Sequence, residues 1–287
     1  LVGALVVLQG AGLVGSGVSF WSLSSSYFPT TPAVSALAKQ VGDTLVARGS
    51  CQPLPFTVDP GNETGIRPNA NIAYGIREFA AYEPILPHAY YRSWAEVSGQ
   101  HLPGYLQRVG VFCPVITTAE EARVYGVSYV LTAAGTAGPT GSEPAGTVGG
   151  EGLFHIPGSA EATLVDRGGA GAKVPTDAPG TPVTVHHRDD ASWSMKVDVG
   201  TPKLLRLRLT ALPGWHATVD GHSVPLRKWA GGALLEAQVG PGHHSVVIRY
   251  WPPLLTVGMG LAVVSVLALI AVNAAAARRR RAPELPD

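Results

Sequence analysis

Two long apolar stretches enclose a polar middle region in this sequence of 287 residues. Residues 1–23 are almost entirely Leu, Val, Gly, Ala and Ser, and the first charged residue is Lys39. Residues 254–277 also contain no charged side chain. A helix of this second length is about 36 Å long, which is enough to cross a hydrocarbon core of ~30 Å. We therefore predict transmembrane helices at 1–23 and 253–277, and we expect the first to be the truncated end of a preceding span in a longer, polytopic chain.

Charge then predicts the orientation of the chain. Four consecutive arginines, the topology anchor Arg278, Arg279, Arg280 and Arg281, follow the second apolar stretch directly. Basic residues that flank a span favour the cytoplasmic side. We therefore expect a cytoplasmic tail at 278–287 and an extracytoplasmic region at 24–252. Without the tail, the 21 basic and 20 acidic residues fall to 17 and 18, so the outer region is nearly neutral. That balance creates no field that would gather nucleic acid, and we expect no such partner.

Residues 24–133 mix helical and strand patterns. Thr31-Pro32 marks the start of a helix that continues to Val41, and residues 44–48 have the pattern of a short strand. A second helix is predicted at 84–97. Residues 117–121 offer two overlapping capping boxes for a helix that ends near Tyr125, and a strand follows at 127–132. Together these elements predict a small extracytoplasmic α/β subdomain.

The pattern changes after residues 134–150, whose Gly, Ala, Thr, Pro and Ser predict a linker. Beyond it, apolar and polar residues alternate with the period of a strand. Asp220-Gly221 favours a type I′ hairpin turn, and we expect the strands at 234–239 and 245–250 to pair around Gly240-Pro241-Gly242. This half predicts an extracytoplasmic antiparallel β-sandwich at 151–252. The predicted fold class is α+β and membrane-anchored: a small α/β layer plus an antiparallel β-sandwich domain, flanked by transmembrane helices.

Two motifs near the end of the chain resemble the C-terminal part of YfhO-like bacterial membrane proteins. They are LPGWHATVDG at 212–221 and GPGHHSVVIRYWPP at 240–253, and the last apolar stretch follows them. In that family a PGW…VDG hairpin and a G-x-H…Y-x-P strand precede the final transmembrane helix. A looser similarity to the family's outer segment lies in Tyr27-Phe28-Pro29, Pro68 to Asn71, Tyr82-Glu83-Pro84 and Tyr90-Tyr91.

The resemblance implies a polytopic membrane protein of the GT-C glycosyltransferase type in the bacterial plasma membrane. Such proteins are thought to transfer sugars from polyprenyl-phosphate donors to polymers of the cell envelope. Their catalytic acid lies in an early outer loop that has no counterpart here, so no catalytic residue can be assigned. The chain is then an accessory or acceptor-binding part that holds no cofactor of its own. Its expected partners are the lipid bilayer, the remainder of the polytopic chain, and a glycan or lipid-linked sugar. The alternative is a non-catalytic structural or carbohydrate-binding module of the envelope.

An aromatic group with polar neighbours is the candidate carbohydrate-binding surface. Aromatic faces stack on the C–H side of sugar rings, and amide, guanidinium and carboxylate groups hydrogen-bond hydroxyls. The alternative, which we favour for the rings, is packing between the α/β layer and the β-domain. The candidates are Tyr82, Tyr90, Tyr91, Trp94, Asn69, Asn71, Arg77 and Glu83, together with Tyr74, Phe79 and Arg92.

The remaining chemistry-bearing residues give weaker indications. Cys51 and Cys113 either form a disulfide or remain free thiols, because the sequence does not fix the distance between them. The pairs His186-His187 and His243-His244 are expected in surface loops or at strand ends rather than at a metal site, because adjacent strand residues point to opposite faces. GAGLVG at 10–15 matches a nucleotide-binding pattern, but it lies in the predicted span and lacks the acidic partner, so close helix packing explains it better.

Overall fold

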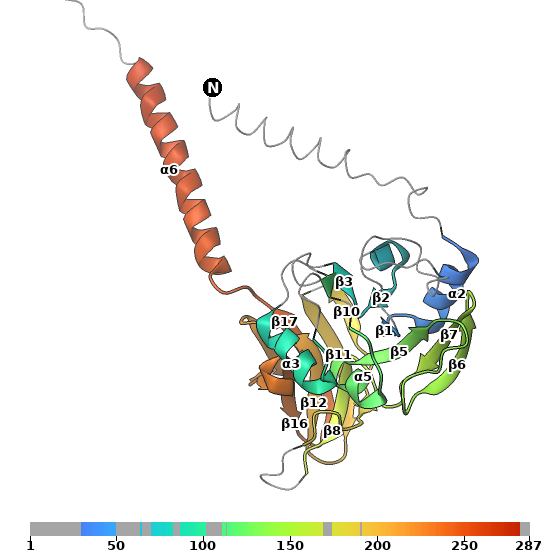
Figure 1. Ribbon diagram of the computed structural model, residues 1–287. Coiled ribbons are helices and arrows are strands. Elements are labelled where there is room, and N and C mark those ends of the chain that lie inside the picture. The colour runs from blue at the N-terminus through green and yellow to red at the C-terminus, as the bar shows by residue number, and fades with distance from the viewer. Residues whose placement is uncertain are drawn as a thin grey trace, which may run out of the picture. The chain divides into compact units, whose positions relative to one another are not determined.

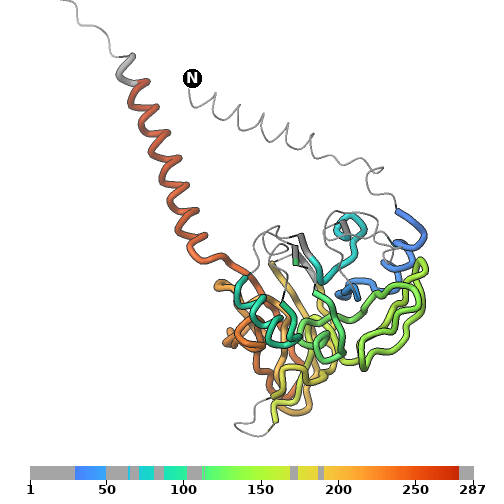
Figure 2. Tube along the Cα trace, in the orientation of Figure 1, coloured from blue at the N-terminus to red at the C-terminus, as the bar shows by residue number. Residues whose placement is uncertain are grey.

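The computed structural model describes residues 30–49, 64, 70–82, 87–101, 111–112, 114–168, 174–189 and 191–281 (Figure 1, Figure 2). These residues form an α+β fold that ends in a long apolar helix, which confirms the predicted class. The chain divides into two compact units. The first unit is residues 1–163 with 173–182, and the second is residues 164–172 with 183–287. The predicted helix at 1–23 and both cysteines lie outside the described residues.

A mixed five-stranded sheet organises the first unit. Its strand order is β2-β1-β5-β7-β6, with β1 parallel to β2 and β5, and with β7 antiparallel to β5 and β6. The strands are β1 (Leu45–Arg48), β2 (Arg77–Glu78), β5 (Val127–Thr132), β6 (Glu143–Val148) and β7 (Glu151–His155). The parallel pairs confirm the α/β character that the mixed pattern predicted.

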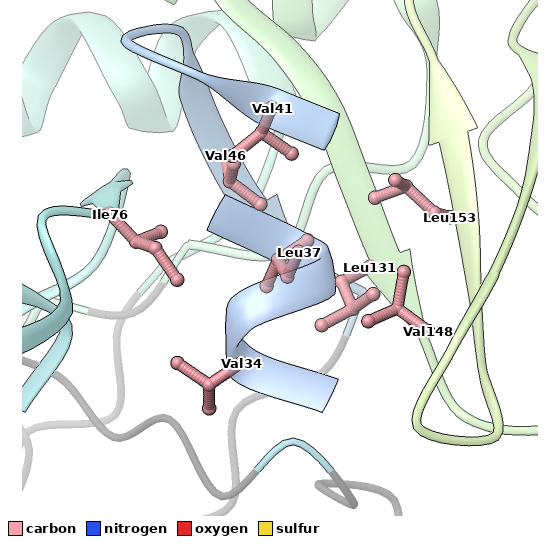
Figure 3. Close-up of a cluster of buried hydrophobic side chains, with 8 residues drawn as sticks. All are labelled: Val34, Leu37, Val41, Val46, Ile76, Leu131, Val148 and Leu153. Atoms are coloured by element: carbon pink, nitrogen blue, oxygen red, sulfur yellow. The ribbon is translucent and has the colours of Figure 1, made fainter. Parts of the chain in front are cut away.

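Helix α2 (Pro32–Val41) packs its apolar side against this sheet (Figure 3). The Thr31 hydroxyl accepts a hydrogen bond from the Val34 N–H at 3.2 Å, and Pro32 stands in the first turn, where no N–H is needed. One cluster of buried side chains joins the helix to its neighbours: Val34, Leu37, Val41, Val46, Ile76, Leu131, Val148 and Leu153. The predicted helix is therefore confirmed.

The other elements of the first unit follow local signals in the sequence. Helix α5 (Ala119–Tyr125) begins with a capping box in which Thr118 and Glu121 bond each other's backbone N–H groups. Helix α3 begins later than predicted, after Pro87, and ends at a left-handed Gly99. The bounds of the remaining elements are α3 (His88–Ser98), η1 (Ala70–Tyr74), β3 (Ala81–Tyr82) and β4 (Val111–Phe112), the last two forming a separate two-stranded sheet.

Residues 134–150 differ from the predicted linker. They include β6, which pairs along its length with β7, so the start of the expected β-domain, residues 151–155, belongs to the first sheet. The small side chains have a packing reason at this place. A Cβ on Gly138 would lie 2.3 Å from the Phe154 ring. The small residues that indicated a linker thus lie in a β-hairpin and in the segment that closely approaches the Phe154 ring.

Two five-stranded sheets contain the strands of the second unit, and one of them also includes Ala162, Thr163, Thr181 and Pro182, which are counted with the first unit. Their orders are β10-β11-β17-β13-β14 and β15-β16-β12-β8-β9. The first contains β10 (His186–Asp189), β11 (Ser192–Val199), β17 (Gly242–Tyr250), β13 (Trp215–Val219) and β14 (His222–Val224). The second contains β15 (Arg227–Trp229), β16 (Leu234–Val239), β12 (Lys203–Thr210), β8 (Ala162–Asp166) and β9 (Thr181–Pro182), and the short η2 (Ala230–Gly232) precedes β16. Both sheets bury apolar side chains such as Val197 and Leu205, while their packing as a sandwich stays a prediction.

One predicted strand pair is wrong, and one predicted turn is confirmed. β16 pairs with β12 and β15, whereas β17 pairs with β11 and β13. Gly240-Pro241-Gly242 therefore leads the chain from one sheet to the other. The prediction failed because alternation specifies which face each side chain of a strand occupies, but not which strand is its partner. Asp220 and Gly221 both have positive φ, 52° and 80°, as a type I′ turn requires, and they join β13 to β14.

Helix α6 (Leu255–Arg281) contains the apolar segment Leu255–Ala277, which is long and apolar enough to cross a membrane. None of the side chains in this segment is buried. At 1.5 Å per residue its 23 residues extend about 35 Å. Among the described residues this is the one helix that meets those criteria, and it coincides with the predicted span at 253–277.

Candidate functional site

The rings of the candidate carbohydrate surface lie largely in the core of the first unit. Trp94 is 1% exposed, and its ring centroid is 5.8 Å from that of Phe79 and 5.4 Å from that of Tyr125. Tyr90 is partly buried, with its ring 5.4 Å from Tyr125 and 6.0 Å from Phe112. Burial raises the pKa of the Tyr90 and Tyr125 hydroxyls above their usual value. These contacts give most of the rings a packing role within the first unit.

Other candidates retain exposed surface on α3 and η1. Tyr91 is half-buried, and Arg92 is exposed beside Glu96, 3.8 Å away. Tyr74 is half-buried and packs against the cluster of Figure 3. Tyr91 and Arg92 are consecutive on α3 (His88–Ser98) and both have exposed surface, so we keep them as the candidate, and carbohydrate binding there stays a prediction.

The polar candidates separate into different surroundings. Arg77 forms an ion pair with Glu161 and donates to the Asp43 carbonyl at 3.4 Å. Asn71 is 7% exposed, and its amide donates to the Ile76 carbonyl at 2.7 Å, which closes the turn after η1. Both side chains are thus engaged in contacts within the first unit. Asn69 and Glu83 lie outside the described residues, as does the side chain of Tyr82.

Charged side chains that the sequence analysis missed form a buried network at the end of β1. Arg48 lies between two carboxylates, with Nε 3.2 Å from Glu78 and a terminal nitrogen 3.2 Å from Glu151. Its other terminal nitrogen donates to the Thr64 hydroxyl at 3.0 Å, and the Thr64 N–H donates to Glu151 at 2.9 Å. The side chain of Arg48 is 10% exposed, and those of Glu78 and Glu151 are 3% and 1% exposed.

The network leaves one carboxyl able to hold a proton near neutral pH. Burial raises the pKa of Glu78 to about 7, because desolvation outweighs the attraction of Arg48, and the nearby charge of Glu151 acts in the same direction. Glu78 Oε2 is buried and has no hydrogen-bond partner among the described residues. The Arg48 guanidinium thus pairs with two carboxylates, and this network connects Thr64 to strands β1, β2 and β7. In the sequence, the available signal for this network was the position of charged residues at strand ends, next to glycine or apolar residues.

A second buried cation lies in the second unit. Arg206 is 2% exposed, although it lies between Leu205 and Leu207 on β12, and strand alternation turns it away from the face that these leucines share. Its guanidinium lies 4.4 Å from the Trp229 ring centroid and 3.6 Å from Glu236 on the neighbouring strand. The guanidinium of Arg208 lies 5.4 Å from the same ring. Side chains on both faces of β12 are therefore buried near Arg206. The alternation of apolar and polar residues predicts one buried face, so it does not predict this arrangement.

The histidine pair lies near the start of β17, the central strand of its sheet, and His244 bonds to the β13–β14 turn. His244 Nδ1 is 2.7 Å from the Asp220 carboxylate, which also accepts the Ser245 N–H at 2.8 Å. His243 is exposed and lies 3.2 Å from Asp198. In the described part of the chain, no group of three or more His, Cys, Asp or Glu side chains has the geometry of a metal site.

The Asp220–His244 pair should make stability depend on pH. Hydrogen bonding to His244 lowers the pKa of Asp220 from 3.8, and the same bond raises the pKa of His244 from 6.5. The contribution of the Asp220 carboxylate to folding stability is complete above pH 3.8 and is lost as the pH falls. The contribution of the His244 imidazolium is complete below pH 6.5 and is lost as the pH rises. Asp220→Asn should therefore lower the melting temperature most near pH 5 and less at pH 9. The measurement is thermal unfolding of the detergent-solubilised chain, followed by circular dichroism.

Asp198→Asn is the matched control, because it removes the carboxylate that pairs with His243, and both side chains of that pair are exposed. Its effect on the melting temperature should change less with pH. An effect of Asp220→Asn that is equal at pH 5 and pH 9 would contradict the prediction.

Residues 176–262 match the family model described as bacterial membrane protein YfhO. The matched range covers less than a third of the chain, from the segment before β9 to the eighth residue of α6. It includes both motifs at 212–221 and 240–253, so the resemblance is confirmed over this range. No curated protein and no solved structure matches the chain. The chain is similar here to a family of bacterial membrane proteins, and the match together with α6 supports a location in the membrane.

Proposed function

We propose that this chain is the extracytoplasmic region and final transmembrane helix of a YfhO-like membrane protein of the GT-C glycosyltransferase type. In this role it is an accessory or acceptor-binding part, and the catalytic acid is supplied by another part of the full-length protein. The observation that carries the proposal is the family match, whose range includes β-strands of the second unit and the first eight residues of α6. The donor would be a sugar on polyprenyl phosphate, and the acceptor would be a polymer of the envelope.

The charge pattern around α6 supports the proposed orientation. Arg278–Arg281 continue the helix directly beyond its apolar segment. Basic residues at this place favour the cytoplasm, so that the two units would lie on the outer side. Envelope polymers and their lipid-linked precursors would then be on the same side of the membrane as the candidate residues Tyr91 and Arg92.

The proposal is tested by sugar transfer in membranes that contain the full-length protein. Membranes receive a radiolabelled sugar linked to polyprenyl phosphate, and label in the envelope polymer is measured. Deletion of the gene should abolish the incorporation, and the full-length protein should restore it. Unchanged incorporation after deletion would contradict the transferase proposal and would favour a non-catalytic envelope module.

A variant distinguishes the acceptor role within the same assay. Tyr91→Ala should raise the acceptor concentration needed for half-maximal transfer severalfold, because a half-buried ring loses its stacking face. His222→Ala is the matched control, since His222 is exposed on β14 in the other unit. Equal acceptor dependence in the two variants would contradict an acceptor site at Tyr91.

A further inference from the structure

Apolar and aromatic side chains gather where the second unit joins α6. Trp215 and Tyr250 face each other across β13 and β17, with ring centroids 5.0 Å apart. Next to them in the chain, Leu212 is 43% exposed, Trp251 is 49% exposed and Leu254 is 78% exposed. Exposed apolar groups of this kind mark a contact surface when they are contiguous. We call this group, with Arg249, the junction surface.

A backbone contact joins the two parts of the junction surface. The Trp251 N–H donates to the Gly214 carbonyl at 2.8 Å. Gly214 has a φ of +111°, and a Cβ there would lie 2.4 Å from the Trp251 carbonyl oxygen. The loop at 212–214 is thus held directly against the segment that leads into α6. Leu212 is two residues from Gly214, which limits their separation to about 7 Å.

The segment between β17 and α6 is itself fixed by hydrogen bonds. The Trp251 indole donates to the Thr256 hydroxyl at 3.0 Å, and the Leu255 N–H donates to the Pro252 carbonyl at 3.2 Å. Leu254 has a left-handed φ of +67°, which a leucine adopts only when its surroundings impose it. Trp251 therefore lies at a defined place next to the first turn of the helix.

The length of the apolar segment places this junction at the edge of the bilayer. The 23 residues from Leu255 extend about 35 Å, against a hydrocarbon core of ~30 Å. The segment before Leu255 then falls at the level of the lipid headgroups, where Trp and Tyr are enriched in membrane proteins. Arg249 is exposed on β17, one residue before Tyr250 and on the opposite face of the sheet, at the same end of the strand. A guanidinium suits the phosphate of a headgroup.

We propose that the junction surface lies in the headgroup region of the membrane and binds lipid directly. Leu212, Trp215, Tyr250, Trp251 and Leu254 enter the apolar boundary, and Arg249 pairs with lipid phosphate. The second unit is then held on the bilayer by two segments distant in sequence, the loop at 212–214 and the start of α6. This inference requires α6 to span the membrane, and it does not depend on sugar transfer.

Photocrosslinking in the full chain tests the inference. The chain is reconstituted in vesicles of phosphatidylethanolamine and phosphatidylglycerol, with p-benzoylphenylalanine replacing Leu212. The control carries the same group in place of His222, which is exposed at the opposite end of β13, past the turn. Mass spectrometry after irradiation should show lipid adducts at 212 and at least tenfold fewer at 222. Equal lipid yields at the two positions, or adducts at 212 with protein alone, would overturn the proposal.

The role of Arg249 has its own readout in the same experiment. Arg249→Gln should lower the share of phosphatidylglycerol among the adducts at 212, because the cation favours the anionic headgroup. Arg227→Gln is the matched control, since Arg227 is exposed on β15 in the other sheet of this unit. An unchanged share of phosphatidylglycerol in Arg249→Gln would overturn the assignment of Arg249.

Discussion

Replacing Arg48 with methionine should lower the free energy of unfolding of the first unit by about 3–5 kcal/mol. The change leaves the carboxylates of Glu78 and Glu151 buried without their shared cation, and it removes the bond to Thr64. Native-state hydrogen exchange is the measurement, with β5 reporting on the first unit and β17 on the second. Protection should fall in β5 and stay unchanged in β17.

The loss should also depend on pH. The pKa of Glu78 is raised from 4.5 to about 7, so its carboxyl is neutral in the folded chain at pH 5 and charged at pH 8. Stability therefore falls as pH rises between these values, and the variant, which lacks the attraction of Arg48, should suffer more at pH 8 than at pH 5. Arg92→Met is the control, because its pair with Glu96 is exposed and should contribute less than about 1 kcal/mol. Equal effects of the two variants would show that the buried network contributes nothing specific.

Trp94→Ala should destabilise the first unit by about 3–5 kcal/mol, because a fully buried ring is removed from contact with other rings. Phe79, Phe112 and Tyr125 all lie within 6.2 Å of Trp94, measured between ring centroids. Hydrogen exchange of β5 again gives the free energy. Tyr91→Ala, on the same helix and half-buried, should cost about 1 kcal/mol.

The two variants separate packing from carbohydrate binding. If Trp94 acted mainly on a ligand, Trp94→Ala would weaken glycan binding while protection in β5 stayed close to that of the wild type. That outcome would contradict the placement of Trp94 in the core. Loss of protection with Trp94→Ala, alongside a stable Tyr91→Ala variant, is the result that the structure predicts.

Elements with a complete local signal could be predicted from the sequence. Thr31-Pro32 and the Thr118–Glu121 capping box each specify a helix start, and the strand at 127–132 has the predicted bounds. Asp220-Gly221 specifies its turn because the two residues tolerate positive φ. The span at 253–277 follows from length and the absence of charge alone. In each case the deciding interaction lies within a few residues of the chain.

Features that depend on distant partners could not be predicted. Arg48, Glu78 and Glu151 come together only because β1 pairs with β2 and β5, and β5 pairs with β7. Likewise, nothing in 234–250 indicates that β16 and β17 join different sheets. The burial of Arg206 depends on Trp229, which arrives from β15, two strands away in the sheet. Strand pairing, rather than local pattern, decides all three.

Cysteine labelling in intact cells tests the central claim, that α6 crosses the bilayer with the two units outside, most directly. The full-length protein carries serine in place of every native cysteine, Cys51 and Cys113 included. One cysteine is then introduced as either His222→Cys or Ala282→Cys. A maleimide that does not cross membranes should label position 222 in intact cells and position 282 only after permeabilisation. Labelling of position 282 from outside, with position 222 protected, would contradict the account.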